Sequence, residues 1–238
     1  MLALCLAAIW YLRRPLPPPR VTGYTQITHD DRQKTLVGTD GSRLYFNRMA
    51  GPVLPESIAE VAISGRGTAP IPVALPNPLL VDVSPNGSSF LISAETGLWN
   101  VRILGGQARH MVDAYHGSFS PDGNSVAFSV ANGGIFVVGS DGTGTHKLAH
   151  AGDPVSGIAW SPNGGVLRFT MKDRIWEMPS SGSGLHEVIP GWHGSSAECC
   201  GRWTPDGNSS CSFRTGRFGL STSGAGCSVG LQQSRFRR

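Results

Sequence analysis

The chain has 238 residues, among them 32 glycines and 17 prolines, and only 15% of its residues are charged. Glycine and proline at this level are typical of a chain that turns often, which favours many short strands over long helices. Residues 208–238 hold five arginines and no acidic residue, and without them the net charge of +4 falls to −1. The remainder is close to neutral, so the charge gives no support for nucleic-acid binding by this chain.

The chain begins with twelve apolar residues, 1–12, followed by the sequence RRPLPPPR. A membrane-spanning helix needs about 20 apolar residues, and a secretory signal carries its basic residues before the apolar run. We interpret residues 1–12 as a short apolar helix, the C-terminal half of a transmembrane helix that begins upstream; a short uncleaved anchor is the alternative. Residues 13–23 are then a stiff, proline-rich linker.

One tetrapeptide recurs through the following 180 or so residues at nearly even spacing. Its copies are Ser84, Pro85, Asn86 and Gly87; Ser120, Pro121, Asp122 and Gly123; Ser161, Pro162, Asn163 and Gly164; and Thr204, Pro205, Asp206 and Gly207. Successive glycines are 36, 41 and 43 residues apart, and a weaker copy places Gly41 upstream. Repeats of about 40 residues built from short strands are typical of the blades of a β-propeller.

Each repeat is expected to form four strands, and residues 117–130 show the pattern most clearly. Proline fixes φ at the first central position of the turn, aspartate or asparagine bonds its own backbone, and glycine accepts a positive φ. Val126 and Phe128 alternate with Ala127 in the following strand. The tetrapeptide is therefore interpreted as a structural turn, and Trp160 and Trp203, which precede two of the turns, as filling the space between blades.

The four S-P-D-G-like copies, each followed by an aliphatic-aromatic strand, resemble the TolB-like propeller repeat, a WD-repeat-like family, over residues 24–207. The resemblance implies an all-β fold, here a partial propeller of about four to five four-stranded antiparallel blades. Such propellers occur at the C-terminal side of bacterial membrane-anchored regulators that carry a winged-helix domain or a kinase. It therefore implies a membrane-anchored protein whose propeller lies in the periplasm or another extracytoplasmic space.

The repeat stops after the fourth turn, and residues 208–238 show no period. This polar segment, rich in Ser, Gly and Arg, is predicted to be a disordered tail. One set of synonymous codons for Ser209 onward, when translated in the reading frame that starts at the third base, encodes the next part of the repeat. The translated segment has a strand, a turn and an apolar pair like Ile175-Trp176. We therefore predict a frameshift near Asn208, which the sequence of the gene would test.

No catalytic constellation is apparent, and we expect no catalytic site, cofactor or metal. His193 lies close to Ser195 but lacks the spacing of a nucleophile elbow. His146 and His150 are separated by four residues, but they fall on an expected strand end, where such residues lie about 13 Å apart. Asp122 and Asp206 could approach a cation near the central channel, although turn hydrogen bonding accounts for both.

The sequence thus favours a non-catalytic sensory or protein-interaction module that is a fragment of a longer signalling protein. A protein or small ligand would bind at the mouth of the propeller, with loops 111–117 and 190–199 as candidates. Two alternatives stay open: a propeller associated with a peptidase of the prolyl-oligopeptidase type, and a decayed fragment without independent function.

Overall fold

The computed structural model describes residues 26–51, 55–65, 67–95, 97–188, 198–203, 209–214, 217–222 and 231–232, with side chains up to residue 188 and at Trp203. The expected apolar helix 1–12 and linker 13–23 lie outside these ranges. Within the described ranges, no helix has the length and apolar character needed to cross a membrane.

The described strands form five antiparallel sheets of four strands each. The first three sheets comprise β1 (Lys34–Thr39), β2 (Arg43–Met49), β3 (Pro55–Ala62) and β4 (Thr68–Ile71); β5 (Leu79–Val83), β6 (Ser89–Ala94), β7 (Gly97–Arg102) and β8 (Arg109–Val112); and β9 (His116–Phe119), β10 (Ser125–Ser129), β11 (Gly134–Gly139) and β12 (His146–His150). The last two comprise β13 (Val155–Trp160), β14 (Val166–Met171), β15 (Arg174–Pro179) and β16 (His186–Glu187); and β17 (Glu198–Trp203), β18 (Ser209–Arg214), β19 (Arg217–Thr222) and β20 (Leu231–Gln232).

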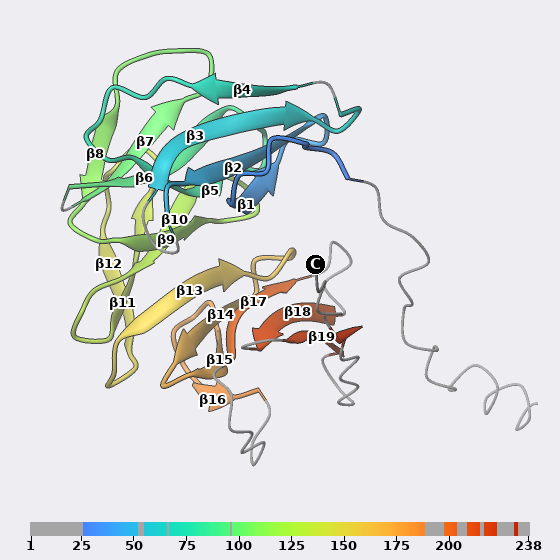
Figure 1. Ribbon diagram of the computed structural model, residues 1–238. Coiled ribbons are helices and arrows are strands. Elements are labelled where there is room, and N and C mark those ends of the chain that lie inside the picture. Colours follow the sequence, from blue (N-terminus) through green and yellow to red (C-terminus); the bar gives the residue numbers. More distant parts are fainter. Residues whose placement is uncertain are drawn as a thin grey trace, which may run out of the picture.

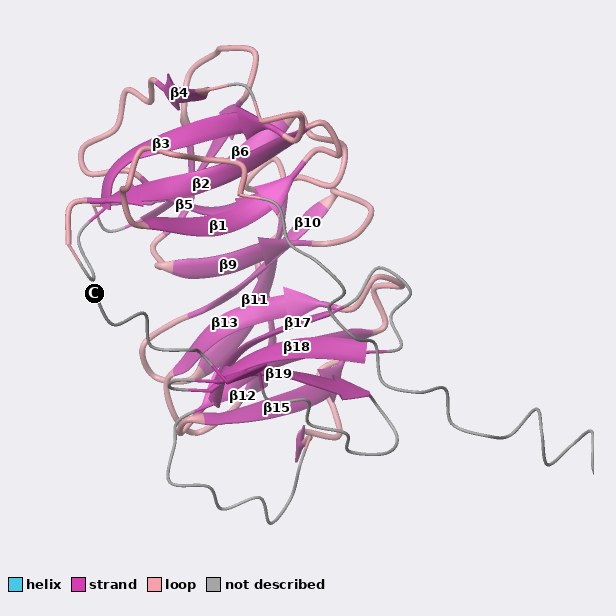
Figure 2. Ribbon diagram, turned by 45° about the vertical axis from the view of Figure 1, so that its right-hand side comes forward, coloured by secondary structure: helices cyan, strands magenta, loops and turns pink. Residues whose placement is uncertain are grey.

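In every sheet the strands are hydrogen-bonded in chain order, and the sheets are arranged as blades around a common centre (Figures 1 and 2). The first strand of each blade contacts the first strand of the next, from β1 through β5, β9 and β13 to β17. Every blade is thus a simple meander whose first strand lies innermost. The predicted all-β fold of four-stranded antiparallel blades in a propeller arrangement is confirmed.

The alternation of side chains along the second strand of each blade explains how the blades pack. Val126 and Phe128 on β10 belong to the buried cluster shared with the second blade, whereas Ala127 between them belongs to the cluster shared with the fourth. Successive residues of a strand point to opposite faces of the sheet. Because both faces are covered by neighbouring blades, apolar residues occupy consecutive positions on these strands.

Three buried apolar clusters hold the first four blades together. They lie between the first and second blades (Tyr45, Ile58, Leu80, Val83, Phe90, Ile92 and Ala94), the second and third (Leu91, Leu98, Met111, Ala114, Phe119, Val126, Phe128 and Val138), and the third and fourth (Ala127, Ile135, Val137, Val155, Ile158, Leu167, Phe169, Met171 and Met178). Burial of this apolar surface between sheets is the main source of stability.

Hydrogen bonds between blades accompany the apolar contacts at equivalent positions near the end of the second strand. The buried amide of Asn47 donates to Leu80 O and accepts from Leu80 N, both at 2.9 Å. In the third blade, Ser129 Oγ donates to Val155 O at 2.8 Å. These side chains satisfy backbone groups on β5 and β13, each of which is the edge strand of its own sheet and so has only one neighbouring strand.

The segment expected to be a disordered tail, 208–238, contains the described strands β18, β19 and β20. They pair in the order β17-β18-β19-β20, which repeats the meander of the other four sheets. Pairing with β17 satisfies backbone groups that an isolated polar segment would leave to water. The origin of this segment in a frameshift stays a prediction.

Candidate functional site: the mouth of the propeller

The recurring tetrapeptide forms the same turn in three consecutive blades. In each, the glycine N–H donates to the serine carbonyl three residues earlier at 2.8 Å. The φ values of Gly87, Gly123 and Gly164 are 64°, 73° and 71°, a region that other L-residues rarely adopt. The fourth copy, Thr204 to Gly207, lies outside the described residues.

Side chains of the tetrapeptide complete the turn. The serine hydroxyl accepts a hydrogen bond from the N–H five residues later, at 2.8 Å for Ser84 and 2.9 Å for Ser120 and Ser161. The same hydroxyl donates to the side-chain oxygen of the third turn residue, which is Asp122 in the third blade and asparagine in the other two. The hydrogen bonds from Ser120 and Asn124 lower the pKa of Asp122 below its ordinary value.

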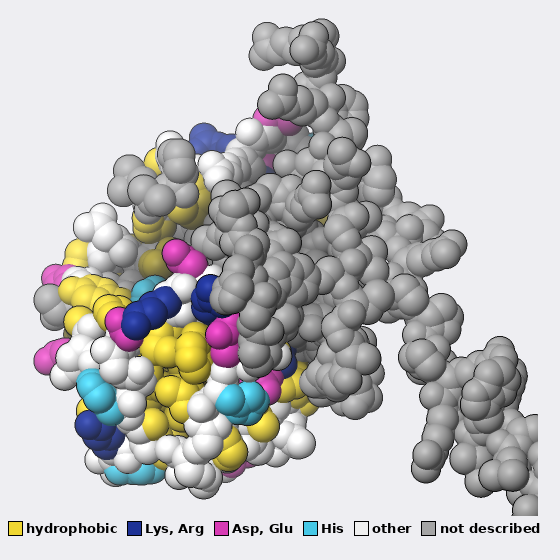
Figure 3. All heavy atoms as spheres, turned by 90° about the horizontal axis from the view of Figure 1, so that it is seen from below, with side chains coloured by type: hydrophobic (Ala, Val, Ile, Leu, Met, Phe, Trp, Pro, Cys, Tyr) yellow, Lys and Arg dark blue, Asp and Glu magenta, His cyan; other side chains and the backbone are white. Residues whose placement is uncertain are grey.

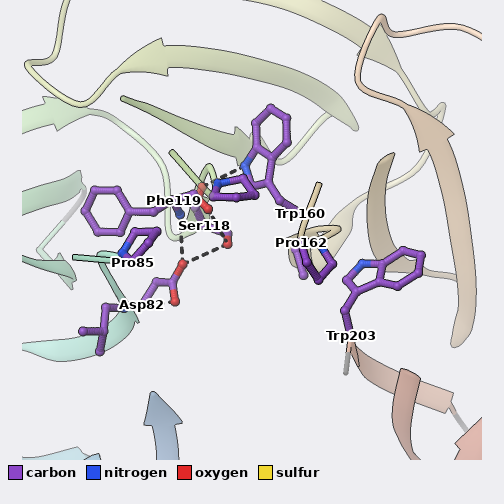
Figure 4. Close-up of a pocket in the computed structure, with 10 residues that line it drawn as sticks. Asp82, Pro85, Ser118, Phe119, Trp160, Pro162 and Trp203 are labelled. Carbon is purple, nitrogen blue, oxygen red and sulfur yellow. Dashed lines mark hydrogen bonds between the residues drawn. The ribbon is translucent and has the colours of Figure 1, made fainter. Parts of the chain in front are cut away.

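The three turns border a hollow of about 270 Å³, which we call the mouth hollow. It lies where the first strands of four successive blades end, and Figure 4 shows the side chains around it. Its lining residues are Asp82, Val83, Pro85, Ser118, Phe119, Pro121, Ala159, Trp160, Pro162 and Trp203. Three pyrrolidine rings from three blades and two indoles thus converge on a single open space, whose lining also includes polar surface.

Among the described residues that line the hollow, Asp82 is the sole ionisable one. Its carboxylate accepts hydrogen bonds from Ser118 Oγ at 2.8 Å and from Phe119 N at 2.9 Å, both in the next blade, and from Val83 N at 3.0 Å. The dashed lines in Figure 4 mark the contacts with Ser118 and Phe119. Asp82 therefore fixes the second blade against the third at the rim and places a carboxylate at the edge of the hollow.

The two tryptophans lie on the side of the hollow away from Asp82 (Figure 4). Trp160 is half-buried, and its Nε1–H donates to Ser118 O in the preceding blade at 3.2 Å. Trp203 Nε1 is buried and has no hydrogen-bond partner among the described residues. The expectation that these residues fill gaps between blades describes one part of their role, since both also line the hollow.

The buried side chain of Arg168 packs against one face of the Trp203 ring. The guanidinium of Arg168 lies 3.7 Å from the centre of the Trp203 ring, a cation–π geometry. Arg168 is 1% exposed and is paired with Glu177, to which its Nε donates at 2.7 Å. Burial lowers the pKa of Arg168, and the charge of Glu177 opposes this effect. The contact holds one face of the indole, which fixes the orientation of the ring at the hollow.

The sequence interpretation located the turns and missed the hollow. Loop 111–117 precedes β9, so it lies at the opposite end of the first strands from the mouth hollow. Most of loop 190–199 lies outside the described residues. The sequence does not mark Asp82, because its partners Ser118 and Phe119 are 36 and 37 residues away and no local motif includes it.

No protein-family model matches the chain, and no curated protein matches it in sequence. Solved structures resemble it in fold. A putative TolB from Agrobacterium tumefaciens aligns with a TM-score of 0.67 at 16% identity, over 84% of this chain and 79% of that one. TolB from Acinetobacter baumannii gives 0.66 and 14%, over 83% and 53%. A chain of the nidogen/laminin complex gives 0.66 and 13%, over 84% and 78%.

These likenesses define the class: the chain is a β-propeller. More particularly, its fold is that of the TolB-like propellers, as the repeat indicates. An oligogalacturonate lyase in complex with manganese aligns less closely, with a TM-score of 0.56 at 12% identity over 81% of this chain and 62% of that one. In the part of the chain that the structure describes, no three His, Cys, Asp or Glu side chains gather where they could hold a metal ion. At these identities each likeness shows the fold alone.

Proposed function

We propose that this chain is a non-catalytic protein-interaction module that binds a polypeptide at the mouth hollow. The observation that carries this proposal is the convergence of two indoles and three prolines on one site, fixed by hydrogen bonds between blades. Tryptophan supplies large apolar contact area with an N–H at one edge, and it is enriched among residues that dominate binding at protein interfaces. The neighbour from the nidogen/laminin complex shows a propeller of this general shape among proteins that assemble with others.

The wider context we propose is a membrane-anchored bacterial signalling protein whose propeller lies outside the cytoplasm. Its support is the order of segments in the sequence: an apolar stretch, a proline-rich linker and then the propeller. The coding sequence upstream of this chain tests the context. A winged helix or a kinase in the same frame, followed by the first half of an apolar helix, is the expected result, and a frame that begins without either would contradict it.

Selection of a random peptide library on the full chain tests binding at the mouth hollow. We expect enriched peptides whose affinity falls at least tenfold in Trp160→Ala, because a buried aromatic anchor dominates such interfaces. Trp176→Ala is the matched control, since Trp176 is also half-buried and hydrogen-bonded through Nε1 but lies on β15, away from the hollow. Peptides that bind Trp160→Ala and the parent chain equally would refute a role for this site, as would a library from which nothing is enriched.

Figure 3 shows acidic and basic side chains interspersed around hydrophobic ones on the face seen from below. A surface of mixed sign does not concentrate one kind of charged partner. On that face, the described side chains therefore give no electrostatic preference, and the mouth hollow remains the feature that carries the proposal.

A further inference from the structure

We propose that residues 15–20 of this same chain, PLPPPR, dock in the mouth hollow. The inference rests on the proposed function, because it assigns an occupant to the same site. It follows from three observations: the chemistry of the hollow, the place where the described chain begins, and the charge of the residues that flank the prolines.

The hollow offers apolar rings and one unpartnered donor. Pro85 and Pro162 are exposed, Trp160 is half-buried, and Trp203 Nε1 has no partner among the described residues. A suitable ligand presents apolar rings and carbonyl oxygens but few N–H groups. A polyproline II segment has this composition, because proline lacks an N–H and its carbonyls point into solvent, and such segments dock against aromatic side chains.

The described chain begins on the same side of the propeller as the hollow. At Gly87, beside the hollow, an added Cβ would lie 3.0 Å from Asp40 Cβ, so the turn after β1 is at the mouth. Ser42 in that turn accepts a hydrogen bond from Ile63 N at 3.0 Å. Ile63 opens the turn between β3 and β4, where a Cβ on Gly65 would lie 3.9 Å from Ile27 O. These contacts place Ile27, near the start of the described chain, on the same side of the first blade as the mouth hollow.

Residues 21–26 are long enough to connect Ile27 to a proline segment placed at the rim of the mouth hollow. Ile27 lies beside the outer turn of the first blade, and strands about 4.8 Å apart place that turn roughly 15 Å from β1. Residues 21–26 separate the proline segment from Ile27, and six extended residues span roughly 20 Å. The segment can therefore reach the rim of the hollow without rearrangement of the blades.

Charge favours the same occupant. Asp82 is the ionisable group of the lining, and the proline segment is flanked by Arg13, Arg14 and Arg20. A guanidinium near a carboxylate at a partly buried rim adds attraction and orients the segment. A stiff proline segment also loses little conformational entropy when it binds.

Indole N–H resonances of the full chain test the proposal. The chain has six tryptophans, and substitution of Trp160 and Trp203 by phenylalanine assigns their signals. The test variant replaces Pro15, Pro17, Pro18 and Pro19 with serine. We expect the signals of Trp160 and Trp203 to move in this variant, and those of Trp99 and Trp176 to stay, because the latter two donate to Ala94 O and Met171 O away from the hollow.

A control variant, Pro72→Ser with Pro76→Ser, removes exposed prolines from the connection between β4 and β5 and should leave all four signals unchanged. A free peptide with the sequence RRPLPPPR should bind the proline-to-serine test variant and restore both signals. Its apparent Kd should be roughly tenfold weaker for the parent chain, because a short tether holds its own segment at a millimolar effective concentration.

Identical Trp160 and Trp203 signals in the parent chain and the test variant would overturn the proposal, whether or not the free peptide binds. If library-selected peptides still bound the hollow in that case, the proposed function would stand and its assigned occupant would be wrong. If neither those peptides nor RRPLPPPR bound, both would fail.

Discussion

The interface between the third and fourth blades and that between the fourth and fifth use the same positions for different chemistry. Ala127 and Val137 face each other across β10 and β11 and are buried against the fourth blade. One blade later, the corresponding pair across β14 and β15 is Arg168 and Glu177. The repeat thus fixes where side chains meet the next blade, and it leaves open whether they meet through apolar contact or through a buried ion pair.

The difference predicts how each interface responds to substitution. An apolar interface loses stability in proportion to the volume removed. A buried ion pair contributes little net stability, yet the loss of one partner leaves an uncompensated charge. Substitutions at the two kinds of interface should therefore differ in their effect on stability.

Phe169→Ala should give the largest loss, about 3 to 5 kcal/mol of unfolding free energy, because it leaves a cavity in the cluster between the third and fourth blades. Phe169 is 1% exposed. Denaturant unfolding of the full chain measures the effect. A loss below about 1 kcal/mol would show that this interface does not carry the stability assigned to it.

Glu177→Gln should cost about 3 kcal/mol, because Arg168 would stay buried without a counter-charge. The double substitution Arg168→Met with Glu177→Leu should recover most of that loss, since it converts the pair into the apolar chemistry of the preceding interface. Denaturant unfolding of both variants makes the comparison. A double variant less stable than Glu177→Gln would mean that the ion pair and the stacking of Arg168 on Trp203 are needed for the blades to dock.

Ser129→Ala should cost about 1 to 2 kcal/mol, because it removes the donor to Val155 O in the next blade and leaves that buried carbonyl unpaired. Ser156→Ala, at an exposed position on β13, is the matched control and should change the stability by less than about 0.5 kcal/mol. Thermal unfolding monitored by circular dichroism distinguishes them. Equal effects would argue that hydrogen bonds between blades contribute nothing specific.

Asp122→Asn should have the smallest effect on the free energy of unfolding, and the two chains should differ in stability in acid alone. The pKa of Asp122 is lowered by hydrogen bonds from Ser120 and Asn124, so the folded state binds its proton less readily than the unfolded state does. The stability from this shift is present above the ordinary pKa of 3.8 and is lost as the pH falls below it. Asparagine holds the equivalent turn at Asn86 without titrating. Acid unfolding curves of the two chains that coincide below pH 4 would contradict this role.

Much of the fold could be predicted because its determinants are local. The turn needs proline, a short polar side chain and glycine in sequence, and the strands around it alternate, so Gly87, Gly123 and Gly164 mark equivalent corners directly. The buried pair Arg168 and Glu177 could not be found in this way, because exposed and buried charges look alike in a sequence. That Arg168 is buried follows from the fifth blade packing over β14 and β15.

The candidate site could be predicted in its parts and not as a whole. The sequence predicts structural roles for the prolines of the turns and for the two tryptophans. Their convergence depends on the rotation between successive blades, which no pattern within one repeat encodes. Asp82 illustrates the limit, because its position next to Ser118 arises from contact between two repeats.

Hydrogen–deuterium exchange of the full chain, with and without a saturating library-selected peptide, tests the central claim most directly. If the mouth hollow is the binding site, bound peptide should slow exchange in residues 82–87, 118–123 and 159–164. Exchange in residues 72–78 and 111–117, at the opposite end of the blades, should be unchanged. Protection confined to those opposite loops, or to the outer strands, would contradict the assignment of the binding surface to the mouth.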